Sequence, residues 1–298
     1  MKIAGRVSTE DLPRICPLVS WGTNPKYQGE ITRQVEVNGA MFGGERPVVI
    51  AGPCAVESRE QTLELARMAK EAGADMLRGG AYKPRTSPHD FQGLGLEGLK
   101  ILRAASEETG LPVVTEVIDV RLVETVAEYA DMIQIGSRSM QNYPLLVEVG
   151  RAGKPVLLKR GMSANLCEWL GAAEYIAQEG NLDIVLCERG IRASCSGEYS
   201  RFSLDLNVIP AVREFTFLPV IVDPSHATGI SSMVEFASRG AIEFGSDGLI
   251  IEIAAPPNGR AKPKCDADQA IDPETLQRIV RFARDQRAAA AHEMNVAG

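Results

Sequence analysis

The stretch of sequence that decides the fold is residues 48–72, VVIAGPCAVESREQTLELARMAKEA. It begins with a short apolar run rich in β-branched side chains, residues 48–51, and continues through a polar turn. It ends in an amphipathic segment, residues 61–72, whose apolar side chains recur near the 3.6-residue period of a helix. The stretch therefore predicts one β-strand followed by one α-helix.

The same strand-then-helix pattern recurs along the rest of the chain. An average spacing of about 30 residues suits a βα unit, and eight units in about 250 residues match a (β/α)8 barrel. The alternative, an open doubly wound sheet, usually has about five or six strands. The sequence therefore predicts an α/β protein in which residues 48–298 form a TIM barrel, with a last helix over 273–284. The predicted strands are residues 48–51, 75–78, 112–115, 132–135, 156–159, 184–187, 220–223 and 248–251.

Residues 1–47 lie outside this repeat. Residues 32–37 alternate between apolar and polar side chains, as a half-buried strand does. Asn38-Gly39 is a preferred pair for a type I′ turn, and the apolar pair Met41-Phe42 follows it. We expect a β-hairpin that covers the floor of the barrel, within an extension too short for a regulatory domain.

Composition and charge narrow the classes of function. The 298 residues include 32 basic and 39 acidic side chains, a net charge of -7, which argues against a nucleic-acid or anionic-membrane surface. No apolar run approaches the roughly 18 residues of a membrane span, and residues 1–5 do not begin a signal peptide, so we expect a cytoplasmic protein. The six cysteines contain no CxxC pair and are interpreted as thiols, available as ligands.

Cations gather where the predicted strands end, which is where barrel enzymes place their active sites. Such a cluster in an acidic protein would repel itself without a counter-charge, so we expect it to bind phosphates together with a carboxylate. Lys83 and Lys159 could instead form Schiff bases. The polar residues that follow the eight strands in turn are Cys54; Arg78, Lys83 and Arg85; Thr115 and Glu116; Gln134, Ser137 and Arg138; Lys159 and Arg160; Glu188, Arg189 and Arg192; Asp223 and His226; and Glu252.

A second group of residues has the chemistry of a metal site. Cys54, His226 and Glu252 follow strands one, seven and eight, and Asp266 or Asp268 could join them. Thiolate, imidazole and carboxylate ligands together suit a borderline divalent ion such as Mn²⁺, Fe²⁺, Co²⁺ or Zn²⁺. The alternative for Cys54 is a small buried apolar side chain.

Six motifs, in order over about residues 47–253, resemble the 3-deoxy-D-arabino-heptulosonate 7-phosphate (DAHP) synthases. The resemblance is to the short microbial subgroup related to the 3-deoxy-octulosonate 8-phosphate synthases. The motifs are Gly52-Pro53-Cys54-Ala55-Val56-Glu57-Ser58, Arg78-Gly79-Gly80-Ala81-Tyr82-Lys83-Pro84-Arg85-Thr86-Ser87, Gln134-Ile135-Gly136-Ser137-Arg138, Leu158-Lys159-Arg160-Gly161, Cys187-Glu188-Arg189-Gly190 and Asp223-Pro224-Ser225-His226-Ala227-Thr228-Gly229.

The resemblance implies a TIM-barrel transferase that condenses phosphoenolpyruvate with D-erythrose 4-phosphate at the first step of the shikimate pathway. It also implies one divalent metal ion, with Mn²⁺ favoured, and a homodimer or homotetramer. Lys83 would protonate the nascent alkoxide, and Glu116 would assist hydration of C2. By motif position, phosphoenolpyruvate would be held by Arg78, Lys83, Ser137, Arg138, Lys159 and Arg189, the aldose phosphate by Arg85, Thr86 and Ser87, and the metal by Cys54, His226, Glu252 and Asp266.

Three stretches depart from the family pattern and keep alternatives open. Residues 253–257 lack the usual Val-His-Pro, residues 193–202 place Phe202 where asparagine is expected, and residues 262–266 are altered. The alternatives are a different aldehyde, such as arabinose 5-phosphate, a barrel that binds a phosphorylated ligand without catalysis, or a Schiff-base aldolase. Proline at position 84 favours the four-carbon aldose. Because no regulatory domain is expected, aromatic amino acids should not inhibit the enzyme unless a partner protein binds.

Overall fold

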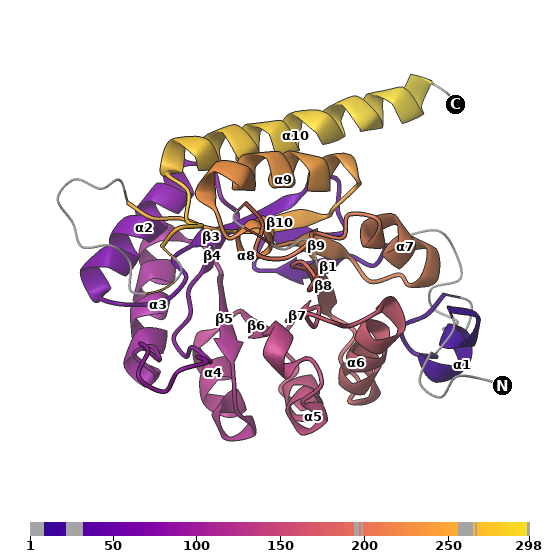
Figure 1. Ribbon diagram of the computed structural model, residues 1–298, viewed down its shortest axis with the longest axis horizontal. Helices are drawn as coiled ribbons and strands as arrows, with labels where there is room; N and C mark the ends of the chain where they lie inside the picture. The colour runs from indigo at the N-terminus through magenta and orange to yellow at the C-terminus, as the bar shows by residue number, and fades with distance from the viewer. Residues whose placement is uncertain are drawn as a thin grey trace.

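Eight parallel strands close into a barrel in the computed structural model, which describes residues 9–21, 32–193, 197, 199–255, 265 and 267–296, with side chains up to residue 286. The hydrogen-bonded order is β10-β3-β4-β5-β6-β7-β8-β9, so the last strand pairs with the first (Figure 1). The closed barrel confirms the predicted fold. The strands are β3 (Val48–Gly52), β4 (Met76–Arg78), β5 (Val113–Val117), β6 (Met132–Ile135), β7 (Val156–Lys159), β8 (Ile184–Glu188), β9 (Val220–Val222) and β10 (Gly248–Glu252).

The strands read as continuous apolar runs because each is buried on both faces. One face packs against the helices, and the other fills the barrel interior with large side chains such as Ile50, Met76 and Leu157. Close approach of neighbouring strands requires glycine at position 52, because a Cβ atom there would lie 2.1 Å from the carbonyl oxygen of Arg78.

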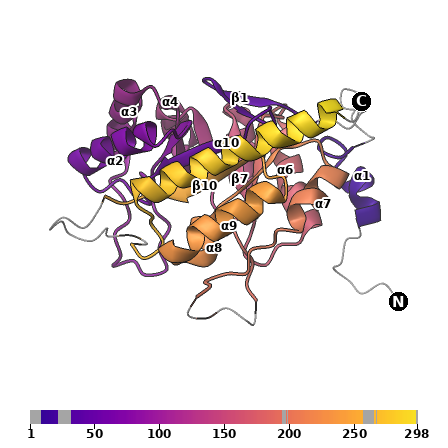
Figure 2. The ribbon, with the colours of Figure 1, turned by 90° about the horizontal axis from the view of Figure 1, so that it is seen from above.

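Helices surround the strands and complete the βα repeat (Figure 1). The long C-terminal helix α10 lies along α9 in both views (Figures 1 and 2). None of the described helices combines the length and hydropathy that a membrane span requires. The helices after the hairpin are α2 (Arg59–Glu71), α3 (Leu96–Thr109), α4 (Val123–Tyr129), α5 (Tyr143–Arg151), α6 (Leu166–Gln178), α7 (Val208–Phe215), α8 (Pro224–Thr228), α9 (Ser231–Glu243) and α10 (Pro273–Val296), with short 3₁₀ turns η3 (Val120–Leu122) and η4 (Ser137–Ser139).

The predicted hairpin is present and covers the floor of the barrel. Strand β1 (Val35–Val37) pairs antiparallel with β2 (Ala40–Phe42), and both turn residues, Asn38 and Gly39, have positive φ angles of 43° and 92°. Apolar side chains of both strands join one buried cluster with the barrel interior, including Phe42 and Met132. The hairpin therefore seals the end of the barrel opposite to the carboxyl ends of its strands.

The segment before the hairpin is tied to the outside of the barrel. A 3₁₀ turn, η1 (Thr9–Asp11), leads into α1 (Leu12–Ile15). The backbone amides of Leu18 and Val19 donate hydrogen bonds of 3.0–3.1 Å to the buried carboxylate of Glu174 in α6. Burial raises the pKa of Glu174, while those amides act to lower it. The division into residues 1–47 and 48–298 stays a prediction.

Candidate active site

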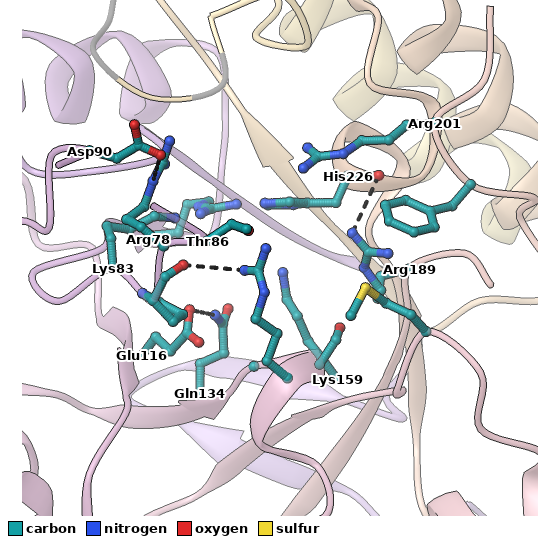
Figure 3. Close-up of a pocket in the computed structure, with 17 residues that line it drawn as sticks. Arg78, Lys83, Thr86, Asp90, Glu116, Gln134, Lys159, Arg189, Arg201 and His226 are labelled. Atoms are coloured by element: carbon teal, nitrogen blue, oxygen red, sulfur yellow. Dashed lines mark hydrogen bonds and ion pairs between the residues drawn. The ribbon is translucent and has the colours of Figure 1, made fainter. Parts of the chain in front are cut away.

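The carboxyl ends of the strands surround a cavity of about 160 Å³ (Figure 3). Its lining includes seven cations and two carboxylates, Asp90 and Glu116. This excess of positive charge is the local anion site that the sequence predicts in an acidic protein. The described lining residues are Arg78, Lys83, Pro84, Arg85, Thr86, Asp90, Glu116, Gln134, Gly136, Ser137, Arg138, Lys159, Met162, Arg189, Arg201, Phe202 and His226.

Arg78 ends β4 at the bottom of the cavity, beside the carboxylate of Glu252. Its Nη1 atom lies 3.0 Å from Glu252 Oε1, and both side chains are buried. Burial acts to lower the pKa of Arg78, but the negative charge of Glu252 raises it above its ordinary value, so the guanidinium stays charged. Arg78 Nε is a buried donor without a hydrogen-bond partner in the part of the chain that the structure describes. It remains available to an anionic ligand.

Lys83 reaches back from the loop after β4 to the residue that follows β3. Its Nζ atom donates to the backbone oxygen of Cys54 at 3.3 Å and to Cys54 Sγ at 3.1 Å. Burial acts to lower the pKa of Lys83, but the nearby sulfur atoms and the carboxylates of Glu252 and Glu116 raise it. Lys83 is therefore an ammonium group at neutral pH, suited to donate a proton and unsuited to attack a carbonyl.

Lys159 and His226 contact the same carboxylate, that of Asp223, which is fully buried. Burial acts to raise the pKa of Asp223, but the hydrogen bond from His226 and the charge of Lys159 hold it well below its ordinary value. The ionised carboxylate can only accept hydrogen bonds, so His226 Nδ1 donates to Asp223 Oδ2 at 2.7 Å and His226 Nε2 keeps its lone pair.

The candidate metal ligands Cys54, His226 and Glu252 meet at one point beneath the cavity. One ligand atom of each lies within 4.8 Å of the other two, and His226 Nε2 is 3.4 Å from Glu252 Oε1. Burial lowers the pKa of His226, which favours the neutral imidazole that metals bind. This buried set of sulfur, nitrogen and oxygen donors fits a borderline divalent ion. The fourth predicted ligand, Asp266, lies outside the described residues.

A second thiol adjoins the metal-ligand set. Cys265 Sγ lies 3.1 Å from Cys54 Sγ and accepts a hydrogen bond of 2.7 Å from Arg85 Nη1. The hydrogen bond to Cys265, together with burial, raises the pKa of Cys54 well above its ordinary value. Without metal, Cys54 is therefore a thiol, and a metal ion must displace its proton to bind.

The residues predicted for the aldose phosphate are only partly gathered at the cavity. Arg85 and Thr86 line it, and Arg85 Nε lies 3.5 Å from Asp90 Oδ2. Ser87 is not among the lining residues, and its hydroxyl oxygen accepts a hydrogen bond from the amide of His89. Asp90 therefore occupies a position at the mouth that sequence reasoning did not single out.

Glu116 enters the cavity from β5, as its place at a strand end predicts. Gln134 Nε2, on the neighbouring strand β6, donates to Glu116 Oε2 at 3.2 Å (Figure 3). Glycine is required at position 136, because a Cβ atom there would lie 2.0 Å from Glu116 Oε1. Gln134 and the backbone at Gly136 therefore hold the Glu116 carboxylate in place.

Arg160 and Glu188, both polar residues at strand ends, serve the scaffold. Arg160 Nη1 forms ion pairs with Glu188 at 2.9 Å and with Asp205 at 2.8 Å, and none of the three lines the cavity. Other lining residues that were not predicted as site residues include Met162, Arg201 and Phe202. Arg201 and Phe202 follow β8 after a long loop, too far along the chain for strand-end reasoning to reach them.

The fold and the site together define a class, barrel enzymes that bind phosphorylated anions at the carboxyl ends of their strands beside a mixed-ligand metal site. The chain belongs to the DAHP synthetase I family, which it matches over residues 30–291. A 2-dehydro-3-deoxyphosphooctonate aldolase of Syntrophotalea carbinolica is more distantly similar, 33% identical over 266 residues, or 83% of this chain and 93% of that protein.

DAHP synthase from Thermotoga maritima is similar over most of the chain, in sequence and in two solved structures. The phospho-2-dehydro-3-deoxyheptonate aldolase of that organism is 45% identical over 247 residues, which cover 83% of this chain and 72% of that protein. The crystal structure of that DAHP synthase has a TM-score of 0.83 at 43% identity, covering 92% of this chain and 77% of the other. A truncated form of the Thermotoga maritima synthase has a TM-score of 0.80 at 39% identity, covering 93% and 97% of the two chains.

Proposed function

We propose that this protein condenses phosphoenolpyruvate with D-erythrose 4-phosphate to give DAHP and inorganic phosphate, at the entry to the shikimate pathway. The observation that carries the proposal is a cavity lined by seven cations and by His226, which lies in one cluster with Cys54 and Glu252. A substrate that bears a phosphate and a carboxylate, meeting a second phosphorylated substrate, supplies the counter-charge that such a cavity needs.

Phosphoenolpyruvate would occupy the inner part of the cavity, where Arg78, Lys159 and Arg189 are buried. Their charge-assisted hydrogen bonds to phosphate and carboxylate oxygens are the strong kind, and burial strengthens them further. Lys83 and Ser137, with Arg138, would complete this half of the site. Arg138 is held by a hydrogen bond of 3.2 Å from its Nη1 atom to the backbone oxygen of Pro84.

The aldose phosphate would bind at the outer edge, against Arg85 and Thr86, with Ser87 on the same loop. Asp90 beside Arg85 would orient its guanidinium. In this arrangement the aldehyde end of the aldose would point toward the buried end of the cavity, where it would meet C3 of phosphoenolpyruvate.

The reaction forms a carbon–carbon bond between C3 of phosphoenolpyruvate and the aldehyde carbon. Lys83, as an ammonium group, would donate a proton to the aldehyde oxygen as the bond forms. Water then adds at the cationic C2, assisted by Glu116, and cleavage of the C2–O bond releases phosphate toward the arginine cluster. A divalent ion held by Cys54, His226 and Glu252, with Asp266 as a fourth ligand and Mn²⁺ as the favoured ion, would supply Lewis acidity at the aldehyde oxygen.

The two halves of the site can be tested separately by steady-state kinetics of phosphate release. Arg189→Gln should raise the KM for phosphoenolpyruvate and Arg85→Gln the KM for erythrose 4-phosphate, each by about 10- to 150-fold, because each removes a charged hydrogen bond. Arg121→Gln is the matched control, since Arg121 is 88% exposed and pairs with Asp119. If both site variants raise the same KM, the division of the cavity is wrong.

We further propose a homodimer or homotetramer that acts in the cytoplasm, where phosphorylated substrates of this kind are made and used. Sedimentation of the purified protein would show two or four copies of a 32.2 kDa chain. A single 32.2 kDa species at assay concentration would refute the assembly without touching the chemistry.

A further inference from the structure

Arg189 is a buried cation whose orientation its polar contacts do not fix. Its side chain follows β8 into the cavity and is 5% exposed. Its two hydrogen bonds reach the backbone oxygens of Gly190 and His226 at 3.4 and 3.5 Å, beyond the usual range of about 2.7–3.2 Å. Within the described part of the chain no carboxylate forms an ion pair with it. Burial lowers its pKa, while the charge of Asp223 acts to raise it and that of Arg201 to lower it.

The ring of Phe202 makes a close contact with the face of the Arg189 guanidinium. The guanidinium carbon of Arg189 lies 4.1 Å from the ring centroid, within the range of a cation–π interaction. The Arg201 guanidinium lies 5.7 Å from the same centroid. One half-buried ring therefore contacts two like charges and packs against the guanidinium of Arg189.

The backbone around Phe202 fixes where the ring lies. The Phe202 amide donates to the backbone oxygen of Ala227 at 2.8 Å, and Ser200 Oγ donates to the backbone oxygen of Phe202 at 2.8 Å. Gly190 has a φ of +88°, and a Cβ atom there would lie 2.7 Å from Phe202 Cβ. Glycine at position 190 thus lets the backbone at position 202 approach the end of β8 closely.

We propose that Phe202 is a positioning residue for phosphoenolpyruvate binding, holding the face of Arg189 by a cation–π contact so that its N–H edge points at the substrate. The proposal rests on the proposed function. An aromatic face constrains the guanidinium plane without occupying the in-plane donors, which a carboxylate partner would do. Phe202 acts through Arg189 and does not touch the reacting atoms.

The test weakens the ring quadrupole while keeping its shape. Phe202 is replaced in the full-length protein by mono-, di- and trifluorophenylalanine, and the Kd for phosphoenolpyruvate is measured by calorimetry. We expect the Kd to rise stepwise with fluorination, to a total of about 3- to 30-fold, with an unchanged unfolding midpoint. Phe202→Leu, which removes the ring, should raise the Kd at least as far. Phe202→Tyr, which keeps an aromatic ring, should leave the Kd within about threefold of the wild-type value.

Two controls separate this role from simple packing. The same fluorinated residues at Phe42, a fully buried ring on the barrel floor, should leave the Kd unchanged. In an Arg189→Gln background, fluorination at position 202 should lose most of its effect, because the cation that the ring holds is gone. A Kd that does not respond to fluorination at position 202, or an equal response in the Arg189→Gln background, would overturn the proposal.

Failure of this proposal is distinguishable from failure of the proposed function. Wild-type protein that binds phosphoenolpyruvate and releases phosphate with an aldose, yet shows a Kd indifferent to fluorination, refutes only the role of Phe202. Wild-type protein that neither binds nor consumes phosphoenolpyruvate refutes both.

Discussion

Asp223 Oδ2 accepts a hydrogen bond of 2.7 Å from His226 Nδ1, and the same buried carboxylate forms an ion pair with Lys159. One side chain thus fixes the tautomer of a candidate metal ligand and neutralises a cation of the anion site. Carboxylate partners of this kind orient ligating histidines and raise their basicity. Asp223 therefore links the cation cluster of the cavity to the candidate metal ligands.

Asp223→Asn should damage both sites. The amide cannot neutralise Lys159, so a buried cation is left uncompensated and the free energy of unfolding should fall by about 3–5 kcal/mol. Loss of the partner of His226 should weaken Mn²⁺ binding by about 10- to 100-fold. Urea denaturation and calorimetric titration with Mn²⁺ measure the two effects.

Asp247→Asn is the matched control for that experiment. Asp247 is also buried, and it pairs with Arg213 at 2.9 Å and accepts a bond from the amide of Val220, at the other end of the strands. Asp247→Asn should lower the free energy of unfolding and leave the affinity for Mn²⁺ unchanged. Unchanged metal affinity in Asp223→Asn would contradict the link to the metal ligands.

Metal binding should release about one proton per ion at neutral pH. Cys54 is the source, because its hydrogen bond to Cys265 and its burial raise its pKa and keep the thiol protonated without metal. His226 adds none, because burial lowers its pKa and leaves it neutral. The apparent affinity should therefore increase about tenfold per pH unit below the pKa of Cys54.

Titration of Mn²⁺ into the protein in two buffers of different ionisation enthalpy counts the released protons. Cys54→Ala should bind the ion more weakly and release none. Wild-type protein that binds the ion with no proton release would show that Cys54 is not a ligand.

Arg160→Met should destabilise the protein by about 3–5 kcal/mol, because it leaves the fully buried Glu188 without its cation. Burial raises the pKa of Glu188 even beside Arg160. When folding raises the pKa of a carboxyl group, the folded protein loses stability as the pH rises through that raised pKa. The deficit of Arg160→Met should therefore be larger at pH 8 than at pH 5.

Urea denaturation at the two pH values measures this deficit. The double variant Arg160→Met, Glu188→Gln should recover part of the lost stability, because no uncompensated charge remains. A deficit that is independent of pH, with no recovery in the double variant, would mean that the ion pair is not what stabilises this part of the barrel.

Borohydride should not trap a covalent adduct with either substrate. Lys83 stays protonated because nearby carboxylates and sulfur atoms raise its pKa, and Lys159 is paired with Asp223. A protonated amine does not form a Schiff base. Mass spectrometry of borohydride-treated reaction mixtures checks this, and a substrate adduct on Lys83 or Lys159 would support the aldolase alternative.

The fold could be predicted almost entirely from the sequence. All eight strands begin within one residue of their predicted positions, because parallel strands buried on both faces leave an unbroken apolar signal. The hairpin was equally readable, since Asn38 and Gly39 adopt the positive φ angles that a type I′ turn needs. The last helix extends beyond the predicted 273–284, to Val296.

Of the site residues, only those at or shortly after the end of a strand could be predicted from the sequence. Lys159 and Arg160 are adjacent in the sequence, yet one reaches the cavity and the other pairs with Glu188. Arg160 follows β7 directly and continues its pairing with β8, and successive side chains of an extended chain point to opposite faces. Phe202 and Arg201 could not be found this way, because they come from a distant loop. Their only signal was a departure from the family pattern at position 202.

The most direct test of the account measures phosphoenolpyruvate consumption and phosphate release by chelator-treated protein, with and without added Mn²⁺, against erythrose 4-phosphate and arabinose 5-phosphate. We expect no turnover without metal. With Mn²⁺, we expect turnover that is faster with erythrose 4-phosphate than with arabinose 5-phosphate. Preference for arabinose 5-phosphate would contradict the assigned aldose. Full activity after complete removal of metal would contradict the central claim that Cys54, His226 and Glu252 hold an ion that the reaction requires.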